Sequence, residues 1–116
     1  MAEGFARAYG SDVLEASSAG LAPAAVVQPM TRQVMRARNI SLDGQFPIDL
    51  QIVDLKRFDL IVNLSGCELP FTPPCPVVEW AVRDPIGAKE SVYEQARDEI
   101  EARVIRLVLE LRREAP

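Results

Sequence analysis

The stretch FDLIVNL, residues 58–64, constrains the fold more than any other part of this 116-residue chain. Its apolar residues follow one another almost without a break, whereas a strand with one face in water alternates apolar and polar residues. A short continuous run of this kind is typical of a strand that is buried on both faces, as in a parallel sheet covered by helices. We therefore predict a strand over 58–64 in an α/β domain.

Helical periodicity is clearest near the C-terminus, where apolar residues recur at spacings of three and four. Ser91 and Glu94 fit a capping box, so we predict a helix from Ser91 to Arg113. The other predicted helices cover 2–9, 29–38 and 48–57, the other strands cover 13–19 and 77–82, and a proline-rich loop covers 67–76. This alternation, in a chain of this length, predicts one domain over 1–116 with a parallel sheet between helices.

Composition excludes several kinds of chemistry. The chain has no histidine, which rules out Ser-His-Asp catalysis and histidine-ligated zinc. Its two cysteines, Cys67 and Cys75, are too few for a four-cysteine metal site, and we expect them to be thiols. No metal or organic cofactor is implied.

The charge and hydropathy patterns narrow the range of partners. The net charge is -4 and no basic stripe is present, so we expect no nucleic-acid partner. The apolar runs are short, which predicts no membrane span, and the residues after Met1 do not form a secretory signal. We expect a cytoplasmic protein.

Six stretches in this order resemble the low-molecular-weight phosphotyrosine phosphatase family, which includes the thioredoxin-coupled arsenate reductases. They are MAEGFAR (1–7), SSAG (17–20), PMTRQVMRARNISL (29–42), FDLIVNLSG (58–66), EWAVRDPIG (79–87) and VYEQARDEIEARV (92–104). The resemblance covers nearly the whole chain. It implies a flavodoxin-like open three-layer sandwich with strand order 2-1-3-4, and hydrolysis of phosphomonoesters through a phosphocysteine.

One part of the family pattern is missing. In the family, a central first strand and a loop of cysteine, five residues, arginine and serine precede the MAEGFAR helix, and this loop binds the oxyanion and activates the thiolate. Here the residue six places after Cys67 is Pro73, and six places after Cys75 is Ala81. We therefore expect a chain that is truncated relative to the family, lacks the central strand and is inactive alone. A phosphate- or arsenate-type oxyanion substrate is expected only where that loop is present.

Asp84 is the one catalytic residue that the resemblance assigns. The matching aspartate of the family protonates the leaving oxygen, and Trp80 and Gly87 also stand in family positions. The simpler interpretation is that Asp84-Pro85 only opens a turn. We favour a general acid that has no nucleophile to serve in this chain.

Three alternatives remain. Arsenate reductases use two further cysteines near the third strand, but Ser65 stands where we expect the first of them, which favours a phosphatase with Cys67 and Cys75 as loop thiols. A non-catalytic family member is the second alternative, as a homodimer that covers the exposed strand edge. An unrelated flavodoxin-like binding module is the third, although no glycine-rich loop is present to hold its ligand.

Overall fold

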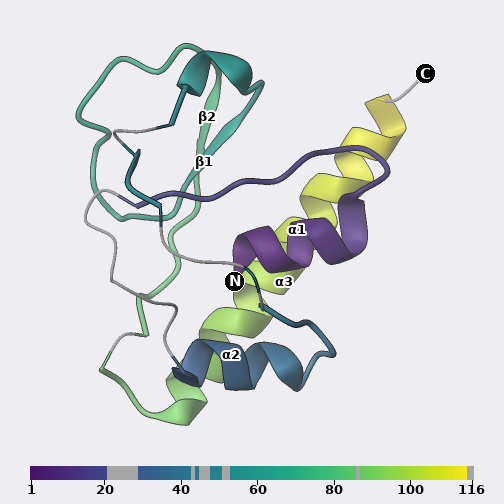
Figure 1. The fold of residues 1–116 in the computed structure, drawn as a ribbon, viewed down its shortest axis with the longest axis vertical. Helices are drawn as coiled ribbons and strands as arrows, with labels where there is room; N and C mark the ends of the chain where they lie inside the picture. The colour runs from purple at the N-terminus through teal and green to yellow at the C-terminus, as the bar shows by residue number, and fades with distance from the viewer. Residues whose placement is uncertain (21–28, 43, 45–47, 51–52, 86, 115–116) are drawn as a thin grey trace.

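The computed structural model describes residues 1–20, 29–42, 44, 48–50, 53–85 and 87–114. Its elements in chain order are α1 (Ala2–Gly10), α2 (Pro29–Arg36), the short 3-10 helix η2 (Leu55–Arg57), β1 (Ile61–Asn63), β2 (Val77–Glu79) and α3 (Glu90–Glu114). The long helix α3 packs against both α1 and α2, and the two strands lie on its other side (Figure 1). The predicted α/β class is confirmed.

The sheet consists of β1 and β2, which run parallel with Ile61 opposite Val77 and Asn63 opposite Glu79. These strands are the central parts of the two runs predicted over 58–64 and 77–82. In the described part of the chain the only other strand-like pairing is a parallel bridge between Gly20 and Asp49. The small parallel sheet expected from the FDLIVNL stretch is therefore present.

The strand predicted over 13–19 is wrong. Val13 closes the turn after α1, and residues 14–19 have no regular structure. A strand forms only with a hydrogen-bonded neighbour. In the part of the chain that the structure describes, backbone pairing of this stretch is confined to Gly20, which donates to the Ile48 carbonyl at 2.8 Å and accepts from the Leu50 amide at 2.9 Å. The apolar composition of this stretch could not reveal that, among the described residues, it has no partner strand.

The helix predicted over 48–57 is also wrong in its described residues, since positions 51–52 lie outside them. Asp49 is part of the bridge to Gly20, the Leu50 carbonyl accepts from the Val53 amide at 3.1 Å, and Leu55–Arg57 form the 3-10 helix η2. The Asp54 carboxylate starts this turn by accepting a 3.2 Å hydrogen bond from the Lys56 amide. None of the three residues of η2 is buried, so packing supplies no reason for the turn to lengthen.

Two predicted helix boundaries shift. The helix α2 ends at Arg36 rather than residue 38, because Asn39 takes a left-handed φ of 60° and the Ile40 amide then donates back to the Met35 carbonyl at 3.1 Å. At the other boundary α3 begins at Glu90, and the Lys89 carbonyl accepts from the Val92 amide at 3.0 Å. Ser91 thus lies inside the first turn, and the predicted capping box is wrong.

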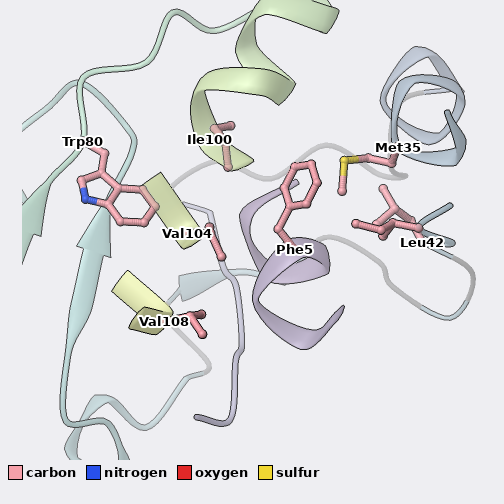
Figure 2. Close-up of a cluster of buried hydrophobic side chains, with 8 residues drawn as sticks. Phe5, Met35, Leu42, Trp80, Ile100, Val104 and Val108 are labelled. Atoms are coloured by element: carbon pink, nitrogen blue, oxygen red, sulfur yellow. The ribbon is translucent and has the colours of Figure 1, made fainter. Parts of the chain in front are cut away.

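The hydrophobic core lies where α1, α2, α3 and the segment after β2 meet. Phe5, Met35 and Val108 are fully or almost fully buried, and Trp80 extends from the end of β2 towards Val104 of α3 (Figure 2). A Cβ atom at Gly10 would stand 2.6 Å from a methyl group of Val108, so only glycine lets α1 approach α3 this closely. This packing fixes Trp80, and with it the segment that carries Asp84.

Candidate functional site

The loops that leave the carboxyl ends of β1 and β2 form the candidate site. Because the strands are parallel, both loops start at the same edge of the sheet, and open α/β sheets bind their ligands at that edge. The loop after β1 carries Ser65 and Cys67, and the segment after β2 carries Trp80 and Asp84. Both strand arrows point towards the half of the molecule that holds α2 and the start of α1 (Figure 1).

A buried asparagine organises this edge. The Asn63 side chain donates from Nδ2 to the Cys67 carbonyl at 2.8 Å and to the Glu79 carboxylate at 3.2 Å. Its Oδ1 accepts from the Ser65 amide at 3.0 Å and from the Ser65 hydroxyl at 2.6 Å. Asn63 is only 4% exposed, and these four bonds satisfy both of its donors and both acceptor sites. The end of β1, its following turn and the end of β2 are thereby held together.

The two thiols lie in the loop after β1. Residues 64–76 contain neither helix nor strand, as their prolines predicted. Cys67 is exposed and Cys75 is half-buried, and both are free thiols. In the turn before Cys67, Gly66 takes a left-handed φ of 75° and the Cys67 amide donates to the Ser65 hydroxyl at 3.2 Å. Hydrogen bonds therefore hold the backbone of Cys67, while the residue itself is exposed.

Asp84 lies in an irregular segment, 81–85, and is exposed. The segment is anchored on its N-terminal side by Trp80, which is buried and whose amide donates to the Asn63 carbonyl at 3.0 Å. It ends in a turn in which the Ala88 amide donates to the Pro85 carbonyl at 2.8 Å, with Gly87 at a φ of 78°. The turn expected from Asp84-Pro85 is present, and Asp84 is an exposed residue near the edge of the sheet.

Two hollows in the described surface lie away from these residues. One, of about 520 Å³, is lined by Gly4, Arg7, Asn39 and neighbouring residues, and the other, of about 370 Å³, lies between α1 and α3. Neither includes Asp84 or a thiol. The described residues also contain no group of three or more cysteine or acidic side chains placed to hold a metal ion. No helix among them is long and apolar enough to cross a membrane.

Asn63 and Ser65 are the site residues that sequence reasoning missed. The available signal was a single amide inside an apolar strand, followed at once by a short polar turn. A buried amide needs partners for all its polar atoms, so its position in FDLIVNL predicts a local hydrogen-bond network. Its bond to Glu79, sixteen residues away, depends on the tertiary pairing of the strands.

Comparison with known proteins decides the family. The family model "Low molecular weight phosphotyrosine protein phosphatase" matches residues 1–116. The chain belongs to this family. The resemblance drawn from the six sequence stretches is confirmed.

Two relatives that this chain matches are arsenate reductases. Arsenate reductase 1 of Bacillus cereus (strain ATCC 10987 / NRS 248) is 36% identical over 110 residues, which cover 90% of this chain and 80% of that protein. The glutaredoxin arsenate reductase of Synechocystis sp. is 27% identical over 115 residues, which cover 96% and 87% of the two chains.

Solved structures agree. An arsenate reductase in the phosphate binding state superposes with a TM-score of 0.84 at 26% identity, covering 95% of this chain and 86% of that one. The arsenate reductase of Archaeoglobus fulgidus gives 0.81 at 29% identity, covering 92% and 86%. The fold of this chain is therefore that of the family.

Proposed function

We propose that this chain is a phosphatase-type family member, built for phosphomonoester hydrolysis through a phosphocysteine, and that residues 1–116 alone do not turn over substrate. The observation that carries the proposal is the accessible carboxylate of Asp84, on a segment anchored by Trp80 at the carboxyl edge of the sheet. Neither Cys67 nor Cys75 is followed at the sixth position by the arginine that an oxyanion loop requires. The acid is thus present without its nucleophile.

The reaction has two steps in an intact site. A thiolate attacks phosphorus, the ester P–O bond breaks, and Asp84 gives its proton to the leaving oxygen. Water then attacks the phosphocysteine, Asp84 takes a proton from that water, and the thiolate is released with inorganic phosphate. An exposed aspartate at the sheet edge suits this role, because it can reach a substrate that a loop at the same edge holds.

Hydrolysis of an aryl phosphate at mildly acidic pH tests the proposal. We expect the 116-residue chain to release no more phenol than buffer does, and Asp84→Asn to behave identically. Turnover by the chain that disappears in Asp84→Asn would show that the chain holds a working nucleophile. Turnover that survives Asp84→Asn but is lost in Cys67→Ser would also refute the proposal, and would identify that thiol as the nucleophile.

Reduction of arsenate is the second candidate, and it is favoured by the names of the relatives. Reduction of arsenate to arsenite needs two electrons, which two thiols supply when they form one disulfide and release two protons. Cys67 and Cys75 share one loop at the candidate site. An assay of arsenite formation with thioredoxin or glutaredoxin as reductant separates the two functions. Reduction abolished by both Cys67→Ser and Cys75→Ser would favour this candidate over the phosphatase.

A further inference from the structure

We draw no further inference here: the strongest candidate, the surface patch where the exposed Ile105 and Leu109 of α3 line a hollow against α1, carries nothing because Arg112 at its rim is already paired with Asp12 and nothing in the structure shows what covers it.

Discussion

The Tyr9 hydroxyl of α1 donates a 2.6 Å hydrogen bond to the Glu101 carboxylate of α3. This bond raises the pKa of Tyr9 above its usual value of 10, with smaller contributions from burial and from the charge of Glu101. Glu101 also lies 3.5 Å from the Arg38 guanidinium. Tyr9 and Glu101 therefore link α1 to α3, and Arg38 adds the segment that follows α2.

The substitution Tyr9→Phe should lower the free energy of unfolding by about 1 kcal/mol or less, since it removes one partly exposed hydrogen bond. Because the pKa of the phenol is higher in the folded than in the unfolded protein, its contribution is complete below pH 10 and is lost as the pH rises through the folded-state pKa. Urea unfolding at pH 7 and pH 11 measures this. A difference between the two proteins that grows with pH would contradict the assignment.

The contact between Gly10 and Val108 gives a second prediction. In Gly10→Ala the new methyl group would stand 2.6 Å from a Val108 methyl group, so we expect a loss of about 1–3 kcal/mol in unfolding free energy. The variant Val108→Ala removes the clashing atom and should cost less in the Gly10→Ala background than in the native chain. Additive losses in the double variant would show that the two residues do not clash. Thermal unfolding of the four proteins measures the coupling.

Asp98 of α3, which shares the Arg38 guanidinium with Glu101, supplies a pH prediction. Hydrogen bonds from Arg97, at 2.8 Å, and from Arg38, at 2.7 Å, hold the pKa of Asp98 below its usual value of 3.8. A carboxylate whose pKa is lower in the folded protein stabilises that protein at pH values above the unfolded-state pKa. This stabilisation is lost as the pH falls through the folded-state pKa. Asp98→Asn should therefore be less stable than the native chain at pH 7. The difference should shrink below about pH 3.8, as measured by urea unfolding across this range. A constant difference would exclude this carboxylate as its source.

The elements that sequence predicted well are those with a local cause. FDLIVNL is apolar enough to identify β1, and the long periodic run near the C-terminus identifies α3. The strand predicted over 13–19 failed because a strand needs a neighbour, and its one described pairing is the bridge at Gly20. The helix expected over 48–57 failed because the Asp54 carboxylate caps a short turn instead.

The candidate site was only partly predictable for the same reason. The position of Asp84 in a turn follows from its neighbour Pro85, a local signal, whereas its role as an acid stays a prediction. The bond from Asn63 to Glu79 exists because β1 and β2 place these residues opposite each other. That register is a tertiary property, and no window of sequence around Asn63 contains it.

Asn63 offers the sharpest test of how the site is held. In Asn63→Asp the Nδ2 donor becomes an oxygen, which would face the Cys67 carbonyl and the Glu79 carboxylate without a proton between them. We expect a loss of about 2–4 kcal/mol at pH 7, because one oxygen of the buried carboxylate would face two acceptors and only the other would keep its hydrogen bonds from Ser65. Burial and Glu79 both favour the protonated acid, so this aspartate should have a raised pKa and the loss should ease as the pH falls. Urea unfolding from pH 4 to pH 8 measures this, with Ser65→Ala as a milder control that removes one hydroxyl from the same network. An unfolding free energy of Asn63→Asp equal to that of the native chain at pH 7 would show that the asparagine does not hold the two loops together.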